Sequence, residues 1–105
     1  MLSTHKKGGL RELKLCAYLI ENGYEVFRNV TADGFIDIVA INKDTMDVHY
    51  IDSKSPVFST KDGSLCNKLG NLSDEQKQKG VKAVIFHEEK AFYLDTDTPE
   101  LKEFV

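Results

Sequence analysis

The sequence lacks tryptophan, has two prolines and two cysteines, and contains no long apolar run. A membrane-spanning helix needs about 20 consecutive apolar residues, so the chain is not expected to cross a bilayer. No charged segment followed by an apolar one marks a secretory leader. With 105 residues, 41% of them hydrophobic and 30% charged, the composition is that of one ordinary globular domain, which we expect in the cytoplasm.

Cysteine and histidine are too few and too scattered to predict a metal or redox motif. Cys16 and Cys66 fit no ligand or redox spacing, and we interpret them as a small core residue and a free loop thiol. His5, His49 and His87 have no ligand spacing among themselves, which disfavours a zinc site.

The chain also lacks a strong excess of either charge, with a formal net charge of −3 at pH 7. A mildly acidic protein is an unfavourable partner for nucleic acid. The acidity is concentrated at the end, however, because residues 88–105 contain six acidic residues and two lysines. The residues before them contain twelve basic and eleven acidic side chains, so the rest of the chain can present a basic face.

Apolar periodicity predicts an amphipathic first helix from about Gly9 to Asn22. Its apolar residues recur at helical spacing (Leu10, Leu13, Ala17 and Ile20, with Cys16 between them). A stripe of basic residues runs beside them (Lys7, Arg11 and Lys14), and a solvated helix face is the simpler interpretation of that stripe.

The remaining pattern predicts an α/β domain without internal repeats. Strands are expected at 24–30, 35–42 and 48–56, joined as an antiparallel meander, and again at 81–88 and 90–96. Ser73 and Gln76 form a capping box that begins a second helix, and Thr98 with Pro99 predicts a short terminal helix. Residues 57–72 show no periodicity, which makes them a candidate substrate-contacting loop.

Two acidic residues interrupt strands that are otherwise apolar. Asp37 lies within FIDIVAIN, and Asp52 lies in VHYIDSKSP, where Lys54 shares its strand face because it is two residues further on. Burying a carboxylate is costly unless a partner compensates its charge. Neighbouring antiparallel strands can bring Asp37 and Asp52 within reach of one cation. The alternative is an exposed ion pair between Asp52 and Lys54, which would stabilise the fold little.

Clustered carboxylates with open positions suit a hard divalent cation. Mg²⁺ characteristically takes one or two carboxylates together with waters and substrate phosphates. A lysine beside such a site can orient a water molecule or stabilise charge on a phosphate in the transition state. The acid pair and Lys54 therefore favour metal-assisted phosphodiester chemistry.

The stretches GFIDIVAIN and VHYIDSKS, at residues 34–42 and 48–55, resemble the PD-(D/E)xK nuclease superfamily. There a G-x-x-D begins one strand and a (D/E)-x-K lies in the next. The resemblance covers roughly residues 8–87 and implies a restriction-endonuclease-like α-β-β-β-α-β core, with a mixed central sheet flanked by helices. In size and layout the chain resembles small VRR-NUC nucleases and archaeal-type Holliday junction resolvases.

The resemblance implies a metal site. Glu12, Asp37 and Asp52 would hold one or two Mg²⁺ or Mn²⁺ ions, and the carbonyl group of Ser53 would be a further ligand. Glu12 occupies the place of a helical glutamate that helps to hold metal in many of these nucleases. A charge pair on a solvated helix face is the alternative role for Glu12.

The resemblance also implies a catalytic lysine, Lys54, with Gln76 as a supporting group near it. Capping of the second helix is compatible with that role of Gln76. The sequence departs from the superfamily's pattern at two positions. Ile36 stands where its name has proline, and Asp52 stands where glutamate is commoner, so a bound metal would shift position.

The function that the resemblance implies is a metal-dependent endodeoxyribonuclease that leaves a 5′-phosphate. Backbone phosphates would be contacted by basic residues of the first helix and the loop (Lys6, Lys7, Arg11, Lys14, Lys61 and Lys68). Such contacts read shape, so branched or four-way junction DNA is the expected substrate, cut by a homodimer. The resemblance does not decide among DNA repair, recombination and phage DNA processing as the biological pathway.

Three alternatives remain at this point. The first is a nicking or restriction-like nuclease acting on linear or single-stranded DNA. The second is a catalytically silent nucleic-acid-binding module of the same fold, which would have no need to keep both acids and the lysine. The third is a purely structural partner protein, which would leave the basic stripe of the first helix unexplained.

Overall fold

The computed structural model describes residues 4–31, 34–56, 58–65, 72–94 and 101–104, and for residues 4–8 the backbone alone. Eight elements follow one another: α1 (Thr4–Glu21), β1 (Tyr24–Arg28), β2 (Ile38–Asn42), β3 (Val48–Lys54), α2 (Asp74–Gln78), β4 (Val81–His87), β5 (Lys90–Leu94) and β6 (Leu101–Glu103). Among the described residues, no helix is long and apolar enough to span a bilayer.

The strands form one six-stranded sheet whose spatial order equals the chain order. All neighbours are antiparallel except β3 and β4, which run parallel. A parallel pair needs a crossover connection, and α2 lies in it. The predicted α/β class, the antiparallel meander of the first three strands and the α-β-β-β-α-β order with a mixed sheet are thereby confirmed.

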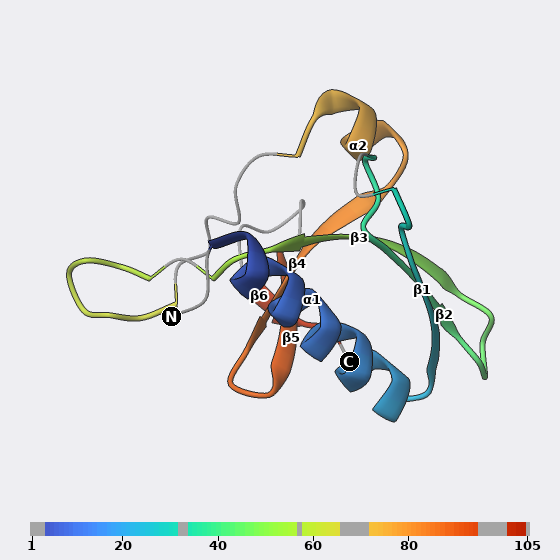
Figure 1. Cartoon of the computed structure of the whole chain (residues 1–105), viewed down its shortest axis with the longest axis horizontal. Coiled ribbons are helices and arrows are strands. Elements are labelled where there is room, and N and C mark those ends of the chain that lie inside the picture. The colour runs from blue at the N-terminus through green and yellow to red at the C-terminus, as the bar shows by residue number, and fades with distance from the viewer. Residues whose placement is uncertain (1–3, 32–33, 57, 66–71, 95–100, 105) are drawn as a thin grey trace.

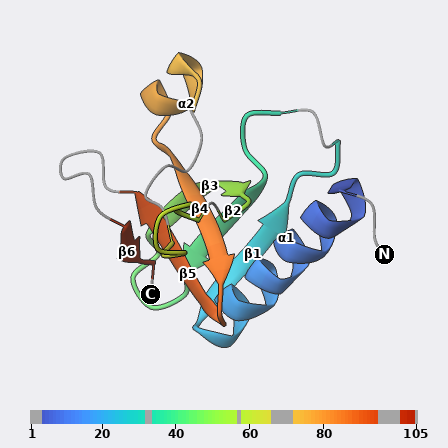
Figure 2. The same cartoon turned by 90° about the vertical axis from the view of Figure 1, so that its left-hand side faces the viewer.

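Helix α1 covers one face of the sheet, where it packs on β1, β4 and β5 (Figure 1). Leu15, Cys16 and Leu19 bury their side chains there against Ile38 and Ile51. Helix α2 contacts β4 and lies away from α1, at the other end of the molecule (Figure 2). A smaller apolar cluster forms on the second face of the sheet, around the buried side chains of β4 (Ala83 and Ile85, with Leu65 and Leu72 packed on them).

The predicted apolar face of the first helix is wrong except at Cys16, which is buried in the core as predicted. Leu10, Leu13 and Ile20 are 43%, 50% and 56% exposed, whereas Leu15 and Leu19 are fully buried. Leu15, Cys16 and Leu19 also follow helical spacing, so the helix carries two apolar stripes, and periodicity alone does not decide which of them faces the sheet. An apolar stripe is left on the outer surface of α1.

The predicted terminal helix is also wrong, because Leu101–Glu103 form β6, antiparallel to β5. Leu101 packs on the smaller apolar cluster, and the Phe104 N–H donates to the Ala91 carbonyl group at 2.8 Å. Tertiary contacts of this kind override local helix propensity. The proposed cap, Thr98 and Pro99, lies outside the described residues.

Candidate active site

Asp37 and Asp52 lie opposite each other on neighbouring strands. The register pairs Ile38 of β2 with Ile51 of β3, and both side chains are fully buried. The next pair along, Asp37 and Asp52, must therefore leave the opposite face, because successive side chains of a strand alternate. Asp37 stands one residue before β2, where its N–H still donates to the Ile51 carbonyl group at 2.9 Å.

The Asp37 side chain closes the end of this strand pair. Its Oδ2 accepts a hydrogen bond from the Ser53 N–H at 2.8 Å. Burial, and then hydrogen bonding to the neighbouring Asp52 carboxyl group, raise the pKa of Asp37 to about 6. The Ser53 N–H opposes this rise but does not cancel it. Two carboxyl groups this close share a proton more readily than they both ionise.

Lys54 contacts the same pair. Its Nζ lies 2.9 Å from Asp52 Oδ2, and the Asp52 side chain is 13% exposed. Asp52 Oδ2 is buried, and among the described residues no donor has the angle of a hydrogen bond to it. The Lys54 ammonium group therefore interacts with this oxygen by charge, and the oxygen still has no hydrogen bond. Acid, acid and lysine come together as the sequence predicted.

Glu12 lies on α1 and has a different partner. Its Oε1 accepts from Arg28 Nε at 3.2 Å, and the two side chains are 21% and 46% exposed. The Glu12 charge is the smallest of the causes that raise the pKa of Asp37, after burial and Asp52. Among the described residues, the structure therefore bonds Glu12 to Arg28 and does not bring it into contact with the acid pair.

The oxygen and the nitrogen of the Gln76 amide group both bond to residues other than Lys54. It forms the predicted capping box with Ser73, and its Nε2 donates to the Phe35 carbonyl group at 2.9 Å. Phe35 is two residues before Asp37, so Gln76 ties α2 to the segment that carries this acid. Its position is one of support for Asp37.

The acid pair fits a hard cation, although no complete metal cage is built. Among the described residues, no three histidine, cysteine, aspartate or glutamate side chains converge on one point. Two adjacent carboxyl groups, one with a buried oxygen that lacks a hydrogen bond, are nevertheless an arrangement that a cation would satisfy. Mg²⁺ needs no more than one or two carboxylates, with water and phosphate as its other ligands.

A small cavity of about 210 Å³ opens beside Asp37 (Phe27, Arg28, Asn29, Ile36, Asp37 and Val39). Asn29 shapes it, because its Nδ2 donates to the Ile36 carbonyl group at 2.9 Å. A Cβ atom at Gly34 would lie 2.5 Å from that Nδ2, which explains why a glycine begins the GFID motif. Arg28 and Asn29 are not among the residues predicted from the sequence. The available signal for Arg28 is that this charged residue shares a strand face with Tyr24 and Val26.

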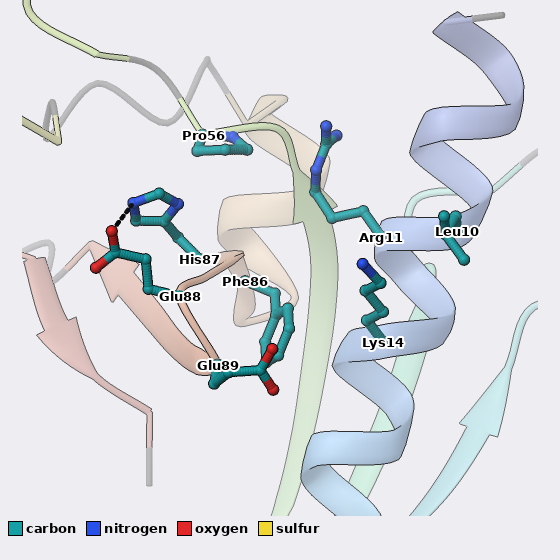
Figure 3. Close-up of a pocket in the computed structure, with 8 residues that line it drawn as sticks. All are labelled: Leu10, Arg11, Lys14, Pro56, Phe86, His87, Glu88 and Glu89. Carbon is teal, nitrogen blue, oxygen red and sulfur yellow. Dashed lines mark ion pairs between the residues drawn. The ribbon is translucent and has the colours of Figure 1, made fainter. Parts of the chain in front are cut away.

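A second and larger groove, of about 310 Å³, lies between α1 and the β4–β5 turn (Figure 3). Arg11 and Lys14 project into it from α1, and Glu88 and Glu89 line the turn opposite. Arg11 Nη1 donates to Ser55 Oγ at 2.7 Å, which places this groove next to the residue that follows Lys54. One wall of the groove is therefore basic and the other acidic.

The other predicted DNA contacts are scattered. Lys6 and Lys7 lie in the first turns of α1, whose side chains are outside the described set. Lys61 is exposed in a tight turn, where the Ser59 N–H donates to the Ser64 carbonyl group at 2.8 Å. Lys68 lies outside the described residues.

Comparisons with known proteins give the fold a precedent. No protein-family model matches the chain, and no curated protein matches its sequence significantly. A solved structure of a bacterial homing endonuclease, I-Ssp6803I, is similar over the whole of this chain and 77% of that chain, with a TM-score of 0.62 and 20% sequence identity. At that identity the likeness establishes a shared fold and nothing about activity.

Proposed function

We propose that the chain is a metal-dependent endodeoxyribonuclease of the PD-(D/E)xK type. The observation that carries this proposal is the cross-strand pair of Asp37 and Asp52 with Lys54 at 2.9 Å from it. The sequence motifs GFID and DSK predict the same three residues. The fold that this chain shares with a protein named as a homing endonuclease also supports the proposal.

Each residue of the site has a definite task in hydrolysis. Asp37 and Asp52 would hold Mg²⁺ or Mn²⁺, with the Ser53 carbonyl group as a further ligand. Such a cation would supply positive charge for the phosphodiester and would lower the pKa of water. In hydrolysis the water oxygen attacks phosphorus and gives up a proton to solvent, the bond to the 3′ oxygen breaks, and that oxygen takes up a proton, which leaves a 5′-phosphate. Lys54 donates hydrogen bonds toward the attacking water or the phosphate oxygens.

Arg11 and Lys14 are the basic residues best placed to contact the DNA backbone. They form one wall of the larger groove, while Glu88 and Glu89 on the other wall repel phosphate (Figure 3). A DNA strand should therefore follow α1 rather than the turn. Lys6, Lys7, Lys61 and Lys68 stay as further phosphate contacts predicted from the sequence.

Branched DNA, in particular a four-way junction, is the substrate that we favour, and the resemblance to small VRR-NUC nucleases and junction resolvases is what supports it. Phosphate contacts read shape, and Arg11 and Lys14 contact no base edge in this proposal. A nicking or restriction-like action on linear or single-stranded DNA uses the same chemistry, so it is the first alternative.

A homodimer would present two such sites. The stripe on the outer surface of α1 favours a second copy as its cover, since Leu10, Leu13 and Ile20 repeat at the spacing used where two helices pack. Sedimentation that shows a single 11.9 kDa species at and above micromolar concentration would refute the dimer.

The proposed activity is tested by incubating the purified protein with four-way junction, flap, linear duplex and single-stranded DNA. Each substrate is combined with Mg²⁺, Mn²⁺ or EDTA, and products are resolved on denaturing gels with end labels that identify a 5′-phosphate. We expect cleavage with metal and none with EDTA. An absence of metal-dependent cleavage on every substrate refutes the nuclease, and binding without cleavage favours the silent module.

One observation favours a catalytically silent nucleic-acid-binding module as the second candidate function. Glu12 is bonded to Arg28, so the three acids implied by the resemblance do not converge among the described residues. A module that had lost catalysis would tolerate that arrangement.

A further inference from the structure

A row of apolar side chains lies directly beside the acid pair. The strand register pairs Phe27 with Val39 and Val39 with Tyr50, so these three residues, here called the aromatic row, cross β1, β2 and β3 side by side. Val39 comes two residues after Asp37, and Tyr50 comes two residues before its neighbour in the pair, Asp52. Residues two apart on a strand share a face, so the aromatic row and the acid pair both lie on the face opposite α1.

The aromatic row is open to solvent. Phe27 is 50% exposed and Tyr50 is 38% exposed, whereas over β4 the same face of the sheet is filled by the smaller apolar cluster. The cavity of about 210 Å³ is lined by Phe27, Val39 and Asp37, so it joins the aromatic row to the acid pair. Exposed apolar surface next to a few converging polar groups is typical of a binding site.

The charges around the aromatic row favour phosphate at one end only. Lys54 lies at the acid end, bonded to Asp52, and Lys79 Nζ lies 5.3 Å from the centre of the Phe35 ring in the segment that leads to the acid pair. At the other end the next residue along the same face of β1 is Glu25, which is exposed. Phosphate is therefore attracted to the acid end and repelled from the Glu25 end, and a bound cation would increase this difference.

The occupant that fits this arrangement is a nucleobase. Adjacent rows of a strand face lie about 7 Å apart, a distance that one nucleotide bridges with its base on the aromatic row and its phosphate at the acid pair. Aromatic side chains stack on any base, because every base has a π-face. A second copy of the chain seated on the row would cover Asp37 and Asp52 as well, which would shut out both cation and phosphate.

We propose that the aromatic row stacks an unpaired base of the DNA strand next to the phosphate that is cut. Bases inside a duplex already stack on one another, so only an unpaired base reaches the row. The substrate is therefore DNA with unpaired nucleotides beside the cut, such as a flap or an opened branch point. This inference rests on the function proposed above and names the substrate class of the same site.

The test compares the affinities for a short single strand and for its fully paired duplex, both with phosphorothioate linkages that resist cleavage. Fluorescence anisotropy measures both affinities with Mg²⁺ and again in EDTA, and their ratio reports the preference for unpaired DNA. In Phe27→Leu and in Tyr50→Leu the ratio should fall at least about fivefold from the wild-type value, because a stacking ring is lost. The fall should be the same in EDTA, since stacking needs no cation.

Variants that keep the ring are the matched controls. Phe27→Tyr and Tyr50→Phe should hold the ratio within about twofold of the wild type, because each retains a π-face of the same size. Cleavage gives a second measure: with Mg²⁺ the wild type should cut a flap at least about tenfold faster than a fully paired duplex, and the two leucine variants should lose most of that preference.

Two outcomes overturn the inference. If both leucine variants, shown folded by circular dichroism, keep the wild-type ratio, the aromatic row contacts no base. If they keep that ratio and also convert a dimer to an 11.9 kDa monomer in sedimentation, a second copy covers the row instead.

Failure of the proposed function gives a different result. A ratio that falls in the leucine variants, together with no metal-dependent cleavage by the wild type, supports the aromatic row as a binding surface and refutes the nuclease. Metal-dependent cleavage by the wild type with an unchanged ratio in the leucine variants keeps the nuclease and overturns the role of the row.

Discussion

The acid pair on the strands and the glutamate on the helix belong to one candidate site but differ in how their charges are met. Asp37 and Asp52 face each other across two strands, partly buried, and burial followed by hydrogen bonding to Asp52 raises the pKa of Asp37 to about 6. Glu12 is bonded to an arginine that is nearly half exposed. The two strand acids therefore have one lysine between them, which leaves room for a further cation, whereas Glu12 has an arginine of its own.

From this difference we expect Asp37 and Asp52 to be essential for holding a metal, and the contribution of Glu12 to depend on its contact with Arg28. The strand register fixes the acid pair, so its need for positive charge exists whether or not DNA is present. The position of Glu12 depends on a single exposed contact. The predictions below test that ranking of the three acids.

The largest effect is expected for the pair. Asp52→Asn should reduce cleavage by about 1,000-fold, since metal-ion stabilisation of the transition state is worth several kcal/mol. Glu12→Gln should reduce it by about tenfold, in the range for outer ligands of a metal site. Single-turnover cleavage of a junction substrate at fixed Mg²⁺ measures both. An equal loss in the two variants would remove the distinction between them.

Lys54→Met should reduce cleavage by about 100-fold, because a positioned donor at the reacting group is lost. The substrate affinity should change little, so the effect should be on kcat rather than KM. Lys43→Met is the matched control, as Lys43 is exposed in the β2–β3 turn and has no role in this account. A Lys54 variant as active as the Lys43 control would show that Lys54 forms only an ion pair with Asp52.

The pH dependence of stability should separate the pair from ordinary surface acids. The pKa of Asp37 is higher in the folded state than its usual value of 3.8, so the folded protein holds this proton more tightly than the unfolded chain does. The resulting stabilisation is complete below pH 4 and is lost as the pH rises through about 6. Without divalent cations, Asp37→Asn should therefore gain thermal stability relative to wild type between pH 4.5 and 7.

Saturating Mg²⁺ is the control for that titration. The cation should stabilise the wild-type protein at pH 7 and should cancel the relative gain of the variant. If the difference in melting temperature between wild type and Asp37→Asn is the same at both pH values, the pair does not share a proton and its need for a cation has been overstated.

The smallest effect is expected at the glycine that supports the pair. Gly34→Ala forces the Asn29 amide group away, which breaks its bond to the Ile36 carbonyl group and should lower the free energy of unfolding by about 1 kcal/mol. Gly9→Ala is the control, because its Cβ atom meets nothing within 4 Å and should instead stabilise α1 by about 0.5–1 kcal/mol. Urea titrations that give both variants the same sign of change would contradict this role of Gly34.

Local sequence signals were enough to predict the strands and the Asp37–Asp52 pair. A carboxylate in a strongly apolar run is costly, and two such runs in succession predict a shared face, which is why Asp37, Asp52 and Lys54 could be placed before the fold was known. The side-chain tasks of Gln76 and Arg28 could not, because each depends on a partner distant in the chain, namely Phe35 and Glu12.

The two errors in the fold have the same origin. Helix α1 has two apolar stripes, and the choice between them is made by the sheet, not by the spacing within residues 9–22. Residues 101–103 form a strand because an edge of β5 is available for pairing. In both cases the deciding contact is tertiary, so a correct reading of the local pattern still leaves the outcome open.

The central claim is that the Asp37–Asp52 pair holds a divalent cation. A calorimetric titration of Mn²⁺ into the wild-type protein and into Asp37→Asn and Asp52→Asn, at pH 7 and without DNA, tests it most directly. The account predicts saturable binding by the wild type and at least about a tenfold weaker affinity in each variant, since each loses one charged ligand. Equal Mn²⁺ affinity in all three proteins, or no binding by the wild type, would contradict it.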